Sequence, residues 1–165
     1  MGNNEVSGAI PEVPQQRRVK NREGNIRQMR RQEARELFMQ MLFQMEMQQD
    51  YSRELKTRFF EWNEPGKSQV EYIDTLYEII HDHLTEIDEK LSEASSNWKV
   101  NRISKVDLAI LRLAAAEILY FKEIPDRVSI NEAVELAKKF GTDDSGRFVN
   151  GVLGKVAGEK NETDQ

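Results

Sequence analysis

Apolar residues recur three and four positions apart along most of the chain, which is the spacing of one face of an α-helix. This pattern predicts a helix from about residues 26–32 to Gln49, a second from Tyr51 to Trp62 and a third from about Gln69 to Leu91. The side chains expected to point inward in the second helix are Leu55, Phe59 and Trp62. Because no useful period-two run appears, the chain is predicted to be all-α.

A polar segment at residues 92–97 separates these helices from a second group. The stretch from Leu108 to Phe121 is apolar on most faces, which predicts the central, buried helix of the fold. Arg112 and Glu117 interrupt this stretch. Because unpaired charges are costly in a core, each is expected to have an ion-pair partner or to lie at a surface edge.

Helix caps are predicted at three places. Ser104 with Asp107, and Ser129 with Glu132, have the spacing of a capping box, in which the hydroxyl accepts a first-turn N–H and the carboxylate reaches back to the backbone. Gly141 follows the apolar positions of the helix expected to begin at Ser129, as a left-handed C-terminal cap does. The polar residues after 158 predict that the chain frays there.

A last helix is expected to open at Asp143 and Asp144, because negative charge suits the exposed N–H groups of a helix start. Arg147 and Asn150 add polar chemistry near this turn that packing alone does not require. The apolar stripe of the helix consists of Phe148, Val149, Val152, Leu153 and Val156.

Composition narrows the class of protein. The 165 residues are 38% hydrophobic and contain no cysteine, which allows a real core and excludes disulfides, thiolate nucleophiles and cysteine-ligated metals. No apolar run is long enough for a membrane span, and the N-terminus lacks the apolar region of a signal peptide, so a cytoplasmic protein is expected. No phosphate-binding, dinucleotide-binding or serine-nucleophile motif is present, so neither an enzyme nor a cofactor is predicted.

The charge is unevenly distributed. Residues 1–35 carry eight Arg and Lys against four Glu, a balance of +4, whereas the remaining 130 residues carry 16 basic and 25 acidic side chains, a balance of −9. Residues 1–26 also hold two of the four prolines and read as a flexible basic extension. A basic arm on an acidic body is typical of nucleic-acid contact, although a merely solvated tail gives the same pattern.

Two clusters invite a metal interpretation. The methionines at 39, 41, 45 and 47 share one predicted helix but only partly one face, so core packing is the favoured reading. His81 and His83 flank Asp82, but residues two apart on a helix point in different directions, so the two imidazoles are not expected to share an ion. No metal site is predicted.

Three stretches resemble the NusB family of bacterial transcription antitermination factors. The most specific is the run INEAVELAKKFGTDDSGRFVNGVLGKV, which is similar to the closing signature of the family. The Arg30–Phe43 stretch resembles its arginine-rich start, and Val106–Glu117 resembles its central helix. The resemblance covers about residues 28–158. Phe43 stands where the family often has tyrosine and Leu108 where a basic residue is common, and each change removes a polar group.

The resemblance implies two small antiparallel helical bundles packed together, with about seven helices in all. We expect residues 27–95 and 96–160 to form these two subdomains of one domain. It also implies that the protein pairs with the ribosomal protein NusE, binds boxA-type single-stranded RNA and joins the elongating RNA polymerase complex during transcription of ribosomal RNA. No membrane partner is expected, and the protein could be a monomer or a homodimer.

The expected RNA contacts follow from how proteins hold single strands, with cations on phosphates and aromatic rings on bases. The phosphate candidates are Arg27, Arg30, Arg31 and Arg35. The resemblance adds Phe43, Arg147 and Phe148 as RNA-binding candidates, whereas the apolar stripe alone favours core packing for Phe148. Asp107 and Asp144 are candidate partner contacts, although a role at a helix start would also explain both.

Two other functions stay open from the sequence. A NusB-like domain also occurs at the N-terminus of some RNA methyltransferases, and that hypothesis requires a catalytic domain beyond Gln165. The other alternative is a module that only binds proteins, or a homodimer that hides the RNA surface.

Overall fold

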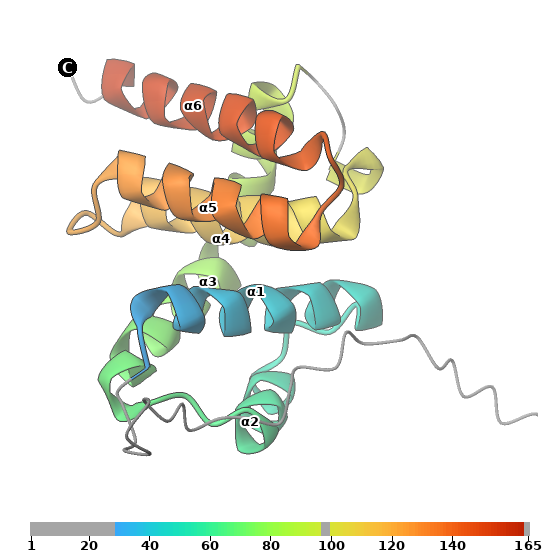
Figure 1. Cartoon of the computed structure of the whole chain (residues 1–165), viewed down its shortest axis with the longest axis vertical. Helices are drawn as coiled ribbons and strands as arrows, with labels where there is room; N and C mark the ends of the chain where they lie inside the picture. Colours follow the sequence, from blue (N-terminus) through green and yellow to red (C-terminus); the bar gives the residue numbers. More distant parts are fainter. Residues whose placement is uncertain (1–28, 97–99, 164–165) are drawn as a thin grey trace, which may run out of the picture.

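A computed structural model describes residues 29–96 and 100–163 of the chain, and every described regular element is helical. The described residues form six α-helices and two short 3₁₀ turns (Figure 1), against the seven or so helices expected for the chain. Their bounds are α1 Arg31–Gln48, α2 Arg53–Trp62, η1 Lys67–Gln69, α3 Val70–Ala94, η2 Val100–Arg102, α4 Lys105–Tyr120, α5 Asp126–Phe140 and α6 Ser145–Thr163. The all-α prediction is confirmed.

Helix α4 is the centre of the fold. It packs against α1, α3, α5 and α6, and twelve consecutive residues from Asp107 to Ile118 are buried. Figure 1 shows α2 at one end of the molecule and α6 at the other, with α4 behind α5. The prediction of a central buried helix is therefore confirmed.

Arg112 and Glu117, the two charged residues of α4 that were expected to need partners, both have them. The Arg112 guanidinium donates to Asp88 on α3 at 2.9 and 2.8 Å and to Glu46 on α1 at 2.7 Å. Glu117, with no exposed surface, pairs with Arg35 on α1. The predicted need for partners is confirmed, and because these pairs join different helices, they fix α1 and α3 against α4.

Trp62 is the clearest error of the hydrophobic pattern. Leu55 and Phe59 are buried as expected, but Trp62 is 75% exposed. Trp62 is the last residue of α2, and at Asn63 the chain leaves the helix. Helical spacing predicts that Trp62 lies on the same face as the buried residues of α2. It does not show whether another element covers that face at the end of the helix.

The predicted helix start at Ser129 is also wrong. Helix α5 begins at Asp126 after Pro125, which places Ser129 inside the helix, where its buried hydroxyl donates to Glu117 at 2.9 Å. The Glu132 carboxylate accepts a hydrogen bond from Gln32 instead of capping the backbone. Each of the two side chains that the spacing assigned to a local cap therefore binds a residue on another helix instead.

The other end of α5 differs from its prediction in a similar way. Gly141 has φ −91° and is not left-handed. A Cβ at this position would lie 2.4 Å from the Ser145 hydroxyl oxygen, so glycine is required by close approach.

The predicted fraying after residue 158 does not occur, since α6 continues to Thr163. At α4, Ser104 Oγ accepts the Asp107 N–H at 3.2 Å, which is one half of the predicted cap.

No helix among the described residues is both long and apolar enough to cross a bilayer. The predicted flexible extension, residues 1–26, lies outside the described residues, as does Arg27. The division into subdomains at residues 95 and 96 stays a prediction.

Candidate nucleic-acid interface

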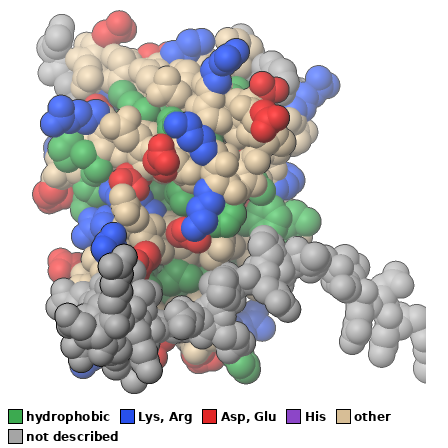
Figure 2. Space-filling view, viewed as in Figure 1, with side chains coloured by type: hydrophobic (Ala, Val, Ile, Leu, Met, Phe, Trp, Pro, Cys, Tyr) green, Lys and Arg blue, Asp and Glu red, His purple; other side chains and the backbone are tan. Residues whose placement is uncertain are grey.

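Helices α1, α5 and α6 lie on one face of the molecule, with α5 between the other two (Figure 1). Gln32 on α1 donates to Glu132 on α5 at 3.1 Å, and Lys139 Nζ lies 2.9 and 3.0 Å from the two carboxylate oxygens of Glu36. Residue numbers rise together along both pairs, so α1 and α5 run in the same direction. Figure 2 shows acidic and basic side chains interspersed on this face, so binding of a polyanion there would depend on a few cations.

The start of α1 presents Arg30 and Arg31 differently. Arg30 is exposed, and its backbone N–H donates to Glu33 at 3.4 Å. Arg31 is half-buried, donates from Nε to Gln69 at 2.7 Å and holds its guanidinium carbon 4.1 Å from the centre of the Tyr72 ring. Arg30 is therefore the freer cation, whereas Arg31 is held in a fixed orientation.

Arg35 belongs to the interior. It is 4% exposed, and its Nε and Nη2 each donate to Glu117 at 2.9 Å. Burial opposes the charged guanidinium, but the hydrogen bonds and charge of Glu117 outweigh it and raise the pKa of Arg35. We therefore assign Arg35 to the core and leave it out of the proposed RNA contacts.

Three helices meet at Glu117. Besides Arg35 on α1, its carboxylate accepts the Tyr72 hydroxyl of α3 at 2.5 Å and the Ser129 hydroxyl of α5 at 2.9 Å. Burial, and next the Glu117 charge, raise the pKa of the Tyr72 phenol well above its usual value, so this hydroxyl remains a donor. The buried cluster thus fixes α1 and α5, the two helices that carry the candidate face.

The α5–α6 turn forms a groove of about 430 Å³ at the end of α5. Lys138 from α5 and the exposed Arg147 and Asn150 from α6 line it, together with Thr142 and Asp143 from the turn. The Ser145 hydroxyl accepts the Thr142 N–H at 2.9 Å, and Gly141 permits that close approach. The turn therefore holds two cations and an amide around an open space suited to a small anionic group.

Phe148 lies beside this groove in the first turn of α6. It packs against the core and yet remains partly exposed, so both of its predicted roles are compatible with its position. Phe43 on α1 is likewise half-buried against the core. Arg31 and Phe43 are separated by about 18 Å along α1 at 1.5 Å per residue. The candidates are thus spread over an elongated face and not gathered in one cluster.

The two candidate partner contacts differ in exposure. Asp144 is exposed at the turn, and its backbone carbonyl accepts the Phe148 N–H at 3.1 Å as the first bond of the helix. Asp107 is 8% exposed, and one of its carboxylate oxygens has no hydrogen-bond partner among the described residues. Asp144 can meet a partner directly, whereas Asp107 presents little surface. For both residues, contact with a partner stays a prediction.

Sequence reasoning missed the lysines at the end of α5. Lys138 lines the groove, and Lys139, paired with Glu36, holds its ammonium 5.2 Å from the centre of the Phe140 ring. The signal was present, because two consecutive lysines precede the turn directly. Cations in the last turn of a helix are ordinarily explained by the helix dipole, so this pair alone does not indicate a binding site.

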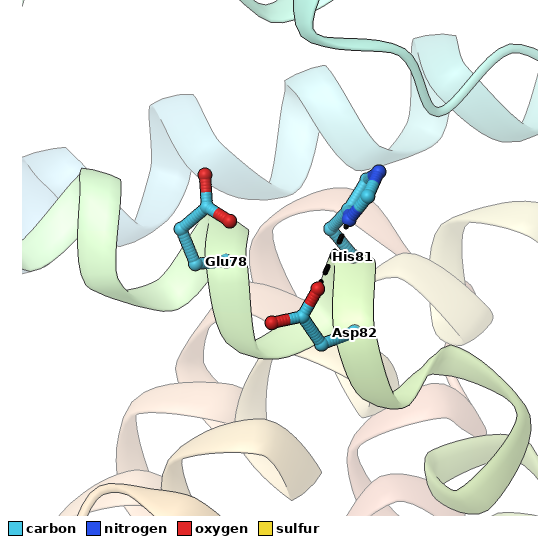
Figure 3. A group of neighbouring side chains, drawn as sticks. All are labelled: Glu78, His81 and Asp82. Carbon is cyan, nitrogen blue, oxygen red and sulfur yellow. Dashed lines mark hydrogen bonds and ion pairs between the residues drawn. The ribbon is translucent and has the colours of Figure 1, made fainter.

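The histidine segment of α3 carries a possible ligand group, Glu78, His81 and Asp82, whose ligand atoms lie within 4.8 Å of one another (Figure 3). The Glu78 carboxylate is already bound by Arg53 at 2.7 Å, and His81 Nδ1 lies 3.2 Å from Asp82. The His83 ring stacks on Tyr120 instead, with the centroids 4.3 Å apart. The two imidazoles face different neighbours, as expected, and we assign no metal role to this surface group.

Comparison with known proteins points to one family. The model of the NusB family matches residues 32–158. The transcription antitermination protein NusB of Natranaerobius thermophilus is 45% identical over 137 residues, which cover 81% of this chain and 99% of that protein. The NusB of Alkaliphilus oremlandii is 48% identical over 128 residues, covering 77% of this chain and 92% of the relative.

Solved structures agree. NusB from T. maritima superposes with a TM-score of 0.74 at 35% identity, covering 84% of this chain and all of that chain. A structure of the antitermination factors NusB and NusE in complex with double-stranded RNA matches with a TM-score of 0.70 at 27% identity, covering 78% of this chain and 96% of that chain.

Proposed function

The chain belongs to the NusB family, and from this we propose that it is a transcription antitermination factor, not an enzyme. In this proposal it pairs with NusE, binds boxA-type RNA as a single strand and joins the elongating RNA polymerase complex in the cytoplasm. The observation that carries the proposal is the match to antitermination proteins over nearly their whole length. The structure of NusB with NusE and double-stranded RNA supports NusE and RNA as partners.

The face formed by α1, α5 and α6 suits a short RNA strand. Arg30 offers a cation at one end, and the groove with Lys138 and Arg147 offers two more near the α5–α6 turn. Phe43 and Phe148 lie half-buried on α1 and α6, where a ring edge or face can meet an unstacked base. The interspersed acidic residues weaken nonspecific attraction of phosphates, so base contacts would carry more of the selectivity.

The proposal is tested by measuring binding to a boxA RNA and to a scrambled RNA of equal length, each with and without NusE. We expect tighter binding to boxA when NusE is present. Equal binding to both RNAs in the presence of NusE would refute specific recognition. Sedimentation of the protein with and without NusE tests the main alternative, a homodimer that hides the RNA surface. If a homodimer dissociates when NusE is added, the RNA surface is hidden until the partner binds.

Replacing Phe148 by alanine is expected to weaken RNA binding by about 1–3 kcal/mol, because the ring would no longer stack on a base. Phe148→Leu is the matched control for packing, since it keeps an apolar side chain against the core but removes the aromatic plane. RNA affinity measured by fluorescence anisotropy should fall in both variants, whereas the melting temperature should fall mainly in Phe148→Ala. Unchanged affinity in Phe148→Leu would leave core packing as the role of this residue.

Arg30→Ala is expected to reduce the slope of log affinity against log salt concentration by about one unit, because one phosphate contact is lost. Thermal stability should hardly change, since the Arg30 side chain is exposed. The measurement is a salt titration of RNA binding. Lys90→Ala, at an exposed cation on α3 outside the proposed face, is the control and should leave the slope unchanged.

A further inference from the structure

Trp62 is held at the surface by a well-defined helix end. The Asn63 backbone N–H and side-chain Nδ2 both donate to the Phe59 carbonyl, at 3.0 and 2.9 Å. Leu55 and Phe59 anchor the helix in the core, while Trp62 is 75% exposed. Helix α2 lies at the end of the molecule away from α5 and α6 (Figure 1). The largest exposed aromatic ring of the described chain therefore lies away from the groove at the α5–α6 turn.

Helix α2, the connection to α3 and the start of α3 carry more exposed unpaired acidic than basic side chains. Four exposed glutamates have no ion-pair partner among the described residues, and they are Glu54, Glu61, Glu64 and Glu71. Two nearby cations are already paired, Arg53 with Glu78 and Lys56 with Asp74, each at 2.7 Å. The exposed Arg58 and Lys67 remain, so the unpaired charges sum to −4 + 2 = −2. This surface repels phosphate and suits a cationic ligand with groups that can lie on an indole ring.

The N-terminal part of the chain enters the described structure beside this surface. Met29 lies against the α2–α3 connection, where its carbonyl accepts hydrogen bonds from Ser68 and Gln69, each at 3.4 Å. A Cβ at Gly66 would be only 2.8 Å from the Met29 Cβ, so this entry requires a glycine. Gly66 follows Trp62 by four residues, a span of at most about 14 Å.

The preceding residues have the required chemistry. Residues 1–28 contain five cations against three glutamates, and the cations are Arg17, Arg18, Lys20, Arg22 and Arg27. Counting back from Met29, Arg27 can reach about 7 Å and Arg22 about 25 Å in an extended chain. The reach of Arg22 exceeds the largest possible span from Gly66 to Trp62. A guanidinium stacks on an indole face and also pairs with carboxylates, which Glu61 and Glu64 supply on either side of Trp62.

We propose that the arginine-rich segment 17–27 of the same chain docks on the surface formed by Trp62, Glu54, Glu61, Glu64 and Glu71. Because the segment is tethered a few residues away, its effective concentration is in the millimolar range, and weak contacts suffice to keep it bound. Docking occupies the cations of the segment and withholds them from other polyanions. A strong polyanion would compete with the glutamates for the same arginines. The docking itself does not depend on the proposed RNA function.

The test uses the full chain with Trp98→Phe, which leaves Trp62 as the single tryptophan. Acrylamide, a neutral quencher, reports how far the Trp62 ring is covered. Changing Arg17, Arg18, Lys20 and Arg22 to Gln should raise the quenching constant about two-fold or more, because the tethered ligand is lost. High salt should do the same in the parent chain, since screening at 1 M reduces the Debye length to about 3 Å.

Matched controls address the other side of the contact. Glu61→Gln with Glu64→Gln should also raise the quenching constant, whereas Glu89→Gln with Glu93→Gln, an equal change of charge on the exposed side of α3, should not. Quenching that stays the same in the arginine and glutamate variants would overturn the proposal. So would protection that depends on protein concentration, which indicates a second copy, or protection that appears only when RNA is added.

A second measurement needs no tryptophan substitution. In the unaltered chain, a carbodiimide joins an amine directly to a carboxylate in contact with it. We expect a cross-link within one chain from Lys20 to Glu61 or Glu64, found by mass spectrometry and lost at high salt. If Lys20 is instead joined to other carboxylates as often as to these two, the segment does not dock on this surface.

Discussion

Glu117→Ala is expected to lower the free energy of unfolding by about 3–5 kcal/mol, because it leaves the buried Arg35 guanidinium without its counter-charge. Arg35 is 4% exposed and Glu117 is fully buried, so water does not replace the lost bonds. The hydroxyls of Tyr72 and Ser129 lose their acceptor in the same step. For a chain of this size the melting temperature should fall by roughly 10 °C or more, as measured by calorimetry.

Two comparisons separate the unpaired charge from lost packing. Arg35→Met with Glu117→Leu removes both charges, and it should cost clearly less than the sum of the two single replacements by alanine. Glu36→Ala breaks the surface pair with Lys139 and should cost less than about 1 kcal/mol, because exposed pairs contribute little. If the double variant costs the full sum, the carboxylate matters only through the space that it fills.

The same cluster shows what hydrophobic spacing predicts and what it does not. The central helix could be predicted because Leu108 to Phe121 is apolar on most faces, and such a helix is stable only inside a fold. The need for partners at Arg112 and Glu117 followed from the cost of a buried charge. Which residues would be those partners did not follow, since Arg35 lies 82 positions from Glu117 and nothing local marks the pair.

Local motifs failed where a distant residue competed for the same polar group. Ser129 and Glu132 have capping-box spacing, but Glu117 and Gln32 bind them, and the helix begins earlier at Pro125 and Asp126. Proline followed by an acidic residue is itself a helix-start signal and would have located the boundary.

The candidate site shows the same limit. Arginine content identified the start of α1 as a possible phosphate site, but composition does not separate the exposed Arg30 from the buried Arg35 five positions further on. The position of an arginine along the helix decides whether its side chain faces water or the core. A buried arginine also needs a buried partner, which Glu117 provides for Arg35. The exposure of Arg147 was easier to predict, because side chains beside a tight polar turn are usually exposed.

Acid is expected to remove about 3 kcal/mol of stability through Glu46 alone. This carboxylate accepts hydrogen bonds from Tyr51, from Arg112 at 2.7 Å and from Lys105 at 3.2 Å, joining the end of α1 to α4. Burial opposes its charge, but these bonds and the Arg112 charge outweigh burial and lower the pKa of Glu46 from 4.5 to about 2. Because the pKa is lower in the folded state, the contribution is complete above about pH 5 and is lost as the pH falls toward 2.

The measurement is urea unfolding of the parent chain and of Glu46→Gln from pH 7 to pH 2. Other carboxylates lose charge in both proteins, so the difference between the two unfolding free energies isolates Glu46. That difference should be largest near neutral pH and shrink by about 3 kcal/mol on acidification, since an amide cannot be protonated there. Glu135→Gln, which removes an exposed carboxylate with a single surface partner, is the control and should change the unfolding free energy little at pH 7. A constant difference for Glu46→Gln would mean that its hydrogen bonds hold the neutral acid as firmly as the carboxylate. The Glu46–Arg112 link from α1 to α4 would then persist at every pH.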